Sequence, residues 1–277
     1  MIHISGTSAL VLLWGGKEAY KSKLAQKYLE QLNLSSGYEL YNECSKIWEH
    51  YNEILRNRKF GVFNFVESIL SEDSDYQVVI LAAGIAPLSL DIIERFPDAK
   101  VFDIDIENMQ MKKKLFHEVS EGRFNNSVQF IESDITNKDI LKQSLVNHGW
   151  DKNKKSIVIA EGISYYITED ELWKAFSLFQ SQDRSNFIIL ESRVPQEKVC
   201  EARRDIQERV WQYLTSALTL KFVTRYFDEK VKEYADKINA EVIEKHTMKD
   251  IEMLRFDRNE IFPTDDSGWI EVRKLKI

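Results

Sequence analysis

The hydrophobic residues of this chain change their spacing at about residue 77. Before that point they recur every three or four positions over 19–32, 47–55 and 60–70, so we expect a helical N-terminal region without strands. After it, short apolar runs alternate with amphipathic stretches. The first run, Val78–Ala82, is continuous, which is typical of a strand buried on both faces of a parallel sheet.

Strands and helices alternate from this run to the end of the chain. The expected strands are 78–82, 101–104, 128–132, 156–160, 186–190, 240–246 and 269–277. The expected helices between them are 88–96, 109–120, 138–146, 169–180 and 248–256. Thr168 and Glu171 form a capping box at the start of the fourth of these helices. The alternation predicts an α/β fold, a doubly wound and mostly parallel seven-stranded sheet whose last strand is antiparallel to the sixth.

Two segments lie outside this alternation. The helical residues 1–72 predict an N-terminal cap, joined by a short acidic linker to an α/β domain over 73–277. Residues 196–238 have no strand signal, so we expect a helical insertion within that domain.

Composition and charge narrow the class of protein. The chain is 43% hydrophobic and 30% charged, as is usual for globular proteins, and its net charge of −7 argues against a nucleic-acid partner. Cys44 and Cys200 lie far apart without histidines at ligand spacing, so we expect neither a disulfide nor a metal site. No apolar run reaches the roughly 20 residues that span a membrane. We therefore expect a cytoplasmic protein without a membrane partner.

The turn after the first strand has the sequence AAGIAP, residues 82–87. Ala83 and Gly84 have little or no side chain, so a ligand can approach this backbone closely. The turn is not the G-x-G-x-x-G fingerprint, which argues against a cofactor with a pyrophosphate, such as NAD. A single glycine is also explained by the turn alone.

Acidic residues follow the second and third strands. Asp103 and Asp105 share a face of the second strand, and we favour Asp105 for binding ribose hydroxyls because it comes last. Asp134 follows the third strand, where it is suited to accept from an adenine amine, with Ile135 beside the ring. The alternatives are a solvated strand end for the first pair and a helix N-cap for Asp134.

The fourth strand ends in IVIAEGISYYIT, residues 157–168. Glu161 follows four apolar residues directly, so it needs a partner, either a ligand or a basic side chain. Arg56, Arg58 and Lys59 lie just before the expected last helix of the cap, and such a cluster is suited to hold a carboxylate, although basic residues between helices are more often solvated. The histidines are scattered, and no nucleophile elbow, H-E-x-x-H or Walker motif is present, which gives covalent or metal-assisted hydrolysis little support.

In this order, the small-residue turn, the two acids and E-G-x-x-x-Y-[IL]-[ST] resemble class I S-adenosylmethionine-dependent methyltransferases. The chain is most similar to the leucine carboxyl methyltransferase family and its bacterial O-methyltransferase relatives. EGISYYIT (161–168) is the most specific match, and SGTSAL (5–10), RKFGVFNFV (58–66) and GWIEV (268–272) also resemble segments of that family.

The resemblance implies S-adenosylmethionine as the cofactor. Arg58 would hold its methionine carboxylate, Glu161 would lie below its amino group, and a segment with Ser5 and Thr7 would close over it. The residues implied at the cofactor site are Thr7, Arg58, Ala83, Gly84, Asp103, Asp105, Asp134, Ile135, Glu161 and Gly162. The family has G-x-G followed by an acid at the turn, whereas Ala82 and Ala86 stand at two of those places, and the arginine usual in the next helix is missing.

The resemblance also implies in-line transfer of a methyl group, and we expect the acceptor to be an oxygen, carboxylate or hydroxyl, of a small molecule. Tyr165, Tyr166 and Arg193 are the candidate catalytic residues, from their positions after the fourth and fifth strands. Aromatic residues of the insertion suggest an apolar or aromatic acceptor, although most such residues belong to the core: Trp211, Tyr213, Phe222, Tyr226 and Phe227. A NAD-dependent oxidoreductase and a non-catalytic, methyltransferase-like binding protein are the alternatives.

Overall fold

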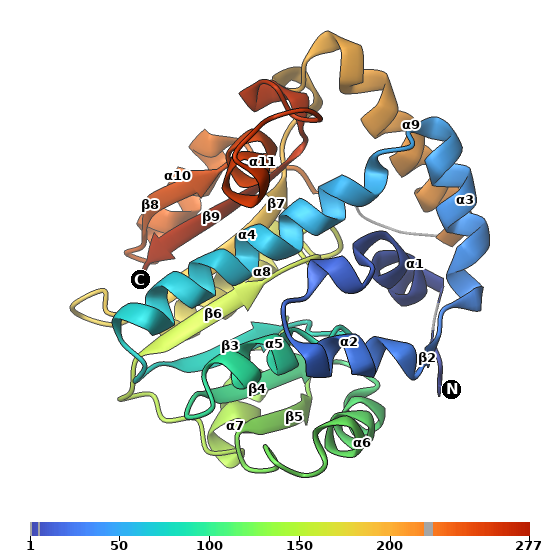
Figure 1. Cartoon of the computed structure of the whole chain (residues 1–277). Coiled ribbons are helices and arrows are strands. Elements are labelled where there is room, and N and C mark those ends of the chain that lie inside the picture. The colour runs from blue at the N-terminus through green and yellow to red at the C-terminus, as the bar shows by residue number, and fades with distance from the viewer. Residues whose placement is uncertain (1, 5, 219–223) are drawn as a thin grey trace.

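The computed structural model describes residues 2–4, 6–218 and 224–277. A seven-stranded sheet lies at its centre, with helices on both faces (Figure 1). The strands are β3 (Gln77–Leu81), β4 (Lys100–Asp105), β5 (Val128–Glu132), β6 (Ser156–Ala160), β7 (Phe187–Arg193), β8 (Glu241–His246) and β9 (Ile270–Lys276). Their order is β5-β4-β3-β6-β7-β9-β8, with β9 antiparallel to both neighbours and the first five strands parallel. The predicted doubly wound, mostly parallel sheet is confirmed.

The helices fill the connections as the spacing predicted. They are α1 (Gly6–Gly15), α2 (Lys23–Glu30), α3 (Tyr38–Ile47), α4 (Tyr51–Glu72), α5 (Leu88–Arg95), α6 (Met109–Ser120), α7 (Lys138–Asn147), α8 (Glu169–Phe176), α9 (Glu201–Leu218), α10 (Asp228–Lys237) and α11 (Met248–Phe256). The capping box of Thr168 and Glu171 is confirmed at the start of α8. No helix in the described part of the chain is long and apolar enough to cross a membrane.

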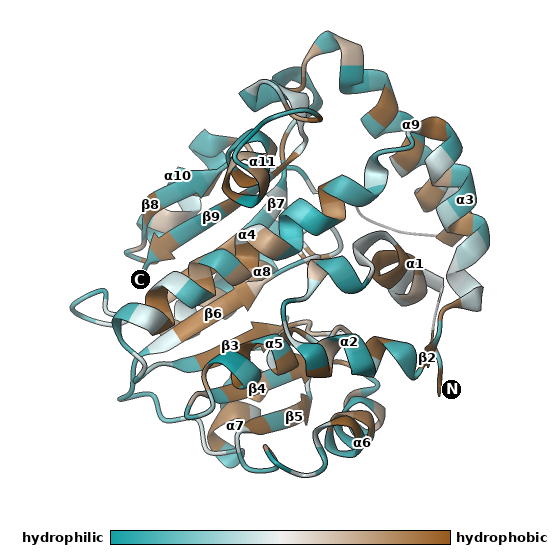
Figure 2. Ribbon diagram, in the orientation of Figure 1, coloured by the Kyte–Doolittle hydropathy of each residue, from teal (hydrophilic) through white to brown (hydrophobic). Residues whose placement is uncertain are grey.

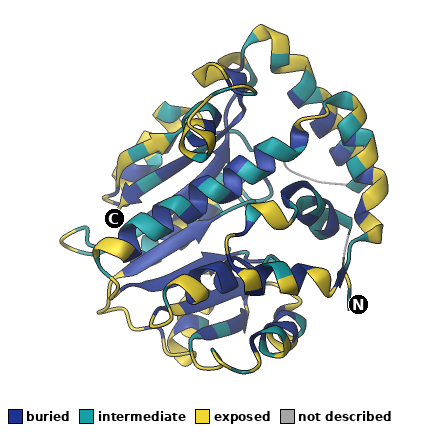
Figure 3. Cartoon of the chain, in the orientation of Figure 1, coloured by how far each residue is buried: buried dark blue, intermediate teal, exposed yellow. Residues whose placement is uncertain are grey.

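Alternate residues of the strands supply two hydrophobic cores. Val78 and Ile80 of β3 pack with α1, α2, α4, α5 and α6, whereas Val79 and Leu81 pack with α7, α8 and α10 on the opposite face. The central strands β3, β6 and β7 are therefore apolar along most of their length (Figure 2) and buried on both sides (Figure 3), whereas the edge strand β8 is largely exposed. Burial on both faces explains why these strands appear in the sequence as continuous apolar runs.

Two expectations for the N-terminal region are wrong. Ile2–His3 (β1) and Leu32–Asn33 (β2) form a small parallel pair, too short to produce a period in the sequence. The two helices expected over 47–55 and 60–70 are one helix from Tyr51 onward, α4, and Gly61 lies inside it as a packing residue. A Cβ at Gly61 would come within 2.7 Å of Ile251, so its absence lets α11 approach α4. Arg58 consequently lies in the middle of a helix, not before one.

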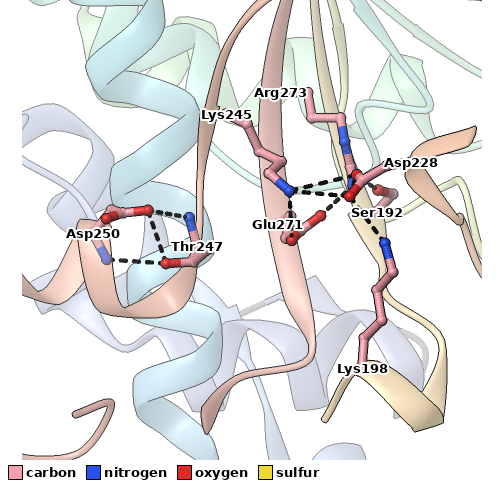
Figure 4. Close-up of polar contacts among 8 residues, drawn as sticks. All are labelled: Ser192, Lys198, Asp228, Lys245, Thr247, Asp250, Glu271 and Arg273. Atoms are coloured by element: carbon pink, nitrogen blue, oxygen red, sulfur yellow. Dashed lines mark hydrogen bonds and ion pairs between the residues drawn. The ribbon is translucent and has the colours of Figure 1, made fainter. Parts of the chain in front are cut away.

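Strand β7 continues beyond its expected end and carries Glu191, Ser192 and Arg193. A polar network beside Ser192 satisfies part of this extension (Figure 4). Arg273 of β9 is buried and donates to Ser192 at 2.6 Å and to Asp228, at the start of α10, at 2.8 Å. Lys198 also donates to Asp228, which ties the region before α9 to α10. The expected helical insertion thus contains α9 and α10, while the division into a cap and a domain at residue 72 stays a prediction.

Candidate active site

A cleft opens where the sheet reverses its winding. The chain passes from β3 to β4 on one side and returns to the other side of β3 as β6, and ligands of doubly wound folds bind outside the carboxyl ends of such strands. We name this cleft the switch-point cleft. Its lining residues are Thr7, Ser8, Val11, Leu12, Arg58, Lys59, Ile80, Ala82, Ala83, Gly84, Ile85, Ala86, Leu88, Glu161, Gly162 and Tyr166.

The turn after β3 forms the floor of the cleft in an unusual backbone conformation. Both Ala82 and Gly84 have positive φ angles, of 53° and 52°. A Cβ on Gly84 would have no protein atom within 4 Å, so the space beside this residue is open. Gly84 supplies both the left-handed backbone and the room for a ligand, whereas Ala82 adopts that backbone with a side chain, which is sterically unfavourable.

Asp105 and Asp103 have different surroundings although they share a face of β4. The two oxygens of Asp105 accept from the amide nitrogens of Gly84 and Ile106, both at 2.7 Å. Asp103 is completely buried, pairs with Lys112 of α6 at 2.7 Å and accepts from Ser89 of α5. Asp105 therefore holds the turn that lines the cleft, while Asp103 joins the sheet to two helices, and neither aspartate is itself among the lining residues.

Asp134 and Ile135 follow β5 at the same edge of the sheet, but neither lines the switch-point cleft. Asp134 is exposed and accepts from the amide and hydroxyl of Thr136, at 2.8 and 2.7 Å. The N-cap of α7 is Asn137, so the alternative of Asp134 as that cap is wrong. Ile135 is buried below the surface of this edge.

Glu161 meets two basic side chains at the end of β6. Arg58 Nε and Lys59 Nζ donate to the same oxygen of Glu161, at 3.1 and 3.0 Å, and all three side chains are less than 10% exposed. Burial alone would raise the pKa of Glu161, but the charges of Lys59 and Arg58 hold it below its ordinary value. The sequence analysis named Arg58 and Glu161 as separate candidates, and the structure places their side chains in contact.

A second cavity adjoins the switch-point cleft on the side of α1, α4 and α9. It is lined by Thr7, Leu10, Val11, Trp14, Tyr51, Leu55, Arg58, Gly162, Tyr165, Tyr166, Trp211, Leu214, Leu218 and Ile270. We name it the aromatic cavity, because five of these residues are tryptophans or tyrosines. Thr7, Val11, Arg58, Gly162 and Tyr166 line both spaces, so the two adjoin through a common wall.

Of the three candidate catalytic residues, Tyr165 and Tyr166 line the aromatic cavity and Arg193 does not. Arg193 is completely buried, pairs with Glu208 at 3.3 Å and lies over the ring of Trp211 at 4.6 Å. It therefore supports one wall of the cavity from behind. Burial raises the pKa of Tyr166 above its ordinary value, so its hydroxyl stays protonated at neutral pH.

Sequence reasoning missed two buried charges near the site. Glu191 of β7 accepts from the amide of Gly162 at 2.8 Å, and Lys112 of α6 pairs with Asp103 and also donates to the carbonyl of Ala83. Each left a signal. Glu191 follows an apolar strand in IILES, as Glu161 does in IVIAE, and Lys112 lies on the apolar face of its helix between Met109 and Phe116.

Among the implied residues, Ser5 lies outside those that the structure describes, as does Phe222 of the insertion. Within the described residues, no group of three or more histidine, cysteine, aspartate or glutamate side chains is placed to hold a metal ion.

The sequence matches the leucine carboxyl methyltransferases over residues 18–180, more than half of the chain. The chain belongs to this family. Its cofactor is S-adenosylmethionine, so both the family and the cofactor that the motifs implied are confirmed.

Solved structures of other proteins share the fold of this chain over most of its length. A DUF574 family protein from Streptomyces avermitilis superposes with a TM-score of 0.70 at 12% identity, over 98% of this chain and 97% of its own. Magnesium protoporphyrin IX methyltransferase from Synechocystis PCC 6803, crystallised with S-adenosylhomocysteine (SAH), gives 0.51 at 10% identity, over 87% and 94% of the two chains.

A curated relative matches a smaller part of the chain. Ribosomal RNA small subunit methyltransferase A of Mycoplasma capricolum is 22% identical over 129 residues, which are 47% of this chain and 44% of that protein. The chain thus spans less than half the length of this relative.

Proposed function

We propose that this family member transfers the methyl group of S-adenosylmethionine to an oxygen atom of a small molecule. The observation that carries the proposal is the common wall of the two spaces. A cleft at the switch point suits the cofactor, and it adjoins a largely apolar cavity through Thr7, Arg58 and Tyr166. Such an arrangement brings a donor and an acceptor together and excludes water from the reaction.

The residues of the switch-point cleft fit S-adenosylmethionine. The buried pair of Arg58 and Glu161 offers opposite charges to the carboxylate and the amino group of a methionine moiety. The open space beside Gly84 admits the chain of that moiety, and Asp105, one strand away, is the acceptor for the ribose hydroxyls. Asp134 and Ile135, at the end of β5, are the adenine end of the proposed site.

When bound, S-adenosylmethionine supplies a methyl carbon that forms a bond to the acceptor oxygen as its bond to sulfur breaks, the electron pair staying on sulfur. The residues of the chain align and desolvate the reactants. Burial holds Tyr166 of the common wall and Tyr51 of the aromatic cavity protonated, and Glu161 of the switch-point cleft is paired with Arg58 and Lys59, so none of these side chains is a ready base. This favours an acceptor that is already ionised, such as a carboxylate, over a hydroxyl. Tyr165 and Tyr166 then act by positioning the acceptor.

A ribosomal RNA acceptor, as in the name of the Mycoplasma relative, does not suit this chain. The net charge of −7 opposes binding to a polyanion, and the aromatic cavity is a small internal space. The second candidate function is a non-catalytic protein that binds the cofactor, favoured by Ala82, which places a side chain in the left-handed turn below the proposed cofactor.

Two measurements test the proposal. SAH at about 100 times its Kd should raise the Tm by roughly 5 °C, and NADH should leave it unchanged. Incubation of the protein and methyl-labelled cofactor with a metabolite extract should then give a labelled, base-labile small molecule. Binding of SAH without any labelled product would favour the non-catalytic alternative, and failure to bind SAH would remove both.

A further inference from the structure

The turn after β3, which forms the floor of the switch-point cleft, has no charge of its own. Residues 82–90 contain no acidic or basic side chain. Their backbone nevertheless adopts a conformation that alanine disfavours, since Ala82 and Gly84 both have positive φ angles, of 53° and 52°. A sparsely populated backbone conformation persists only where the surrounding structure determines it. The groups that fix this turn must therefore come from other elements.

Strand β4 and helix α6 supply these groups. The amide nitrogen of Ala83 donates to the carbonyl oxygen of Ile104 at 2.8 Å, and that of Gly84 donates to Asp105 at 2.7 Å. The carbonyl oxygen of Ala83 accepts from Nζ of Lys112, on α6, at 3.4 Å. The peptide groups on both sides of Ala83 are thus held from outside the turn, two amides by β4 and one carbonyl by α6.

Lys112 is an unusual residue for the face of a helix that packs against a sheet. It is only 1% exposed, and its neighbours on the buried face of α6 are Met109, Leu115 and Phe116. Its ammonium group pairs with Asp103 at 2.7 Å. Apolar residues of similar volume often stabilise a fold as well as a buried ion pair does. The ion pair alone therefore gives no reason for a lysine at this position, whereas the contact with the turn carbonyl does.

We propose that Lys112 is a positioning residue for cofactor binding. It holds the carbonyl of Ala83 and so keeps open the space beside Gly84, while Asp103 holds the ammonium group of Lys112 in place. Lys112 does not line the switch-point cleft, so it acts through the turn and not by contact with the cofactor. This inference rests on the proposed function, since the turn belongs to the proposed cofactor site.

Two variants separate the hydrogen bond to the turn from the ion pair. Asp103→Asn abolishes the ion pair but leaves the ammonium group beside Ala83. Asp103→Asn/Lys112→Met removes both charges and, with them, the donor to the turn, and it leaves no buried charge unpaired, so it should be the more stable of the two. The Kd of SAH, measured by calorimetry, should be at least fivefold higher for the double variant than for Asp103→Asn. If Asp103→Asn does not fold, the natural chain is the reference.

Amide hydrogen exchange, measured without ligand, detects the turn itself. The amides of Ala83 and Gly84 should exchange at least tenfold faster in the double variant than in the reference, because a turn with one anchor fewer opens more often. Ile159 and Ala160 of β6, the strand next to β3, are the controls and should exchange at unchanged rates. A role confined to the stability of the fold would not move the turn amides apart from those of β6.

The titration of the natural chain with SAH comes first. Failure to bind SAH overturns the proposed function and this inference with it. If the natural chain binds SAH, the inference requires both changes in the double variant, the higher Kd and the faster exchange at the turn. An unchanged Kd would mean that Lys112 does not serve the cofactor, and unchanged exchange would mean that it does not hold the turn. Either result overturns the inference and leaves the proposed function intact.

Discussion

Glu191 accepts a hydrogen bond from the amide nitrogen of Gly162 at 2.8 Å and so joins strand β7 to the turn that follows β6. Its side chain is completely buried, and its other oxygen has no hydrogen-bond partner. Burial raises the pKa of Glu191 to about 7, in spite of the opposing influence of Arg58 and the Gly162 amide. A carboxyl group next to the proposed methionine end of the cofactor site therefore titrates near neutral pH.

Stability should depend on pH through this group. An unfolded glutamate ionises near 4.5, whereas folded Glu191 keeps its proton to about 7, so its contribution is complete below pH 4.5 and is lost as the pH rises to 7. Glu191→Gln removes this loss. From about pH 4 to about pH 8, the unfolding free energy of the variant should gain roughly 3 kcal/mol relative to the natural chain.

Urea unfolding at several pH values measures this difference. Burial also raises the pKa of Asp91 to about 7, and Asp91 is present in both proteins, so the difference isolates Glu191. Glu132→Gln, at the exposed end of β5, is the control and should show no such trend. A constant difference across the range would show that Glu191 is ionised throughout.

Ala82 gives a second prediction, because it has a φ of 53° at one of the places where the family has a glycine. An alanine in this conformation carries a strain of about 1–2 kcal/mol, part of which is offset by the greater freedom of glycine in the unfolded chain. Ala82→Gly should therefore stabilise the protein by about 1 kcal/mol, seen as a rise in Tm of a few degrees.

The neighbouring alanine provides the control for this measurement. Ala83 does not have a positive φ, so Ala83→Gly adds only unfolded-state freedom and should destabilise the protein by about 0.5–1 kcal/mol. Destabilisation of similar size by both substitutions would mean that Ala82 is not strained in solution.

The sequence predicted the interior of the sheet better than its surroundings. The bounds of β5 and β6 agree with prediction to the residue. In β6 this reflects burial on both faces, which gives an apolar run after Ser156, whereas β5 carries a half-buried Gln129 and an exposed Glu132. The two-residue strands β1 and β2 leave no such pattern. Residues 56–59 fall between two expected helices, but they belong to α4, and Gly61 within this helix allows close packing against Ile251.

The sequence predicted individual residues of the site but not the contacts between them. Glu161 was expected to meet a ligand or a basic side chain, and its partner Arg58 is 103 residues away, a separation for which a single sequence has no signal. Asp103 and Asp105 share a strand face, and their spacing gave no means of knowing that Lys112 neutralises the first. The fold and the family can be predicted from local sequence patterns, whereas contacts between side chains far apart in the sequence cannot.

Asp103 and Asp105 should respond differently to the same substitution. Asp105→Asn leaves a single oxygen at a position where two accept amide hydrogen bonds beside the proposed ribose site, so it should raise the Kd of SAH at least tenfold with a modest change in Tm. Asp103→Asn leaves Lys112 buried without a counter-ion and should destabilise the fold by about 3–5 kcal/mol.

Calorimetry with SAH and urea unfolding, applied to both variants, separate these effects. The folded fraction of Asp103→Asn should bind SAH with nearly the affinity of the natural chain, provided that the titration is done below its unfolding transition. A loss of SAH affinity in this variant, with no loss in Asp105→Asn, would assign the ribose site to Asp103.

Arg58 tests whether the buried ion cluster recognises the cofactor or only holds α4 to β6. Arg58→Lys keeps the charge beside Glu161 but loses the planar fork that binds a carboxylate through two hydrogen bonds. The Kd of SAH should rise at least tenfold, while the free energy of unfolding falls by only about 1 kcal/mol. Arg209→Lys, on the exposed face of α9 in a pair with Asp205, is the control and should alter neither quantity. If Arg58→Lys lowers stability by several kcal/mol and leaves the SAH affinity unchanged, the cluster is a structural ion pair, and the methionine carboxylate must be held elsewhere in the switch-point cleft.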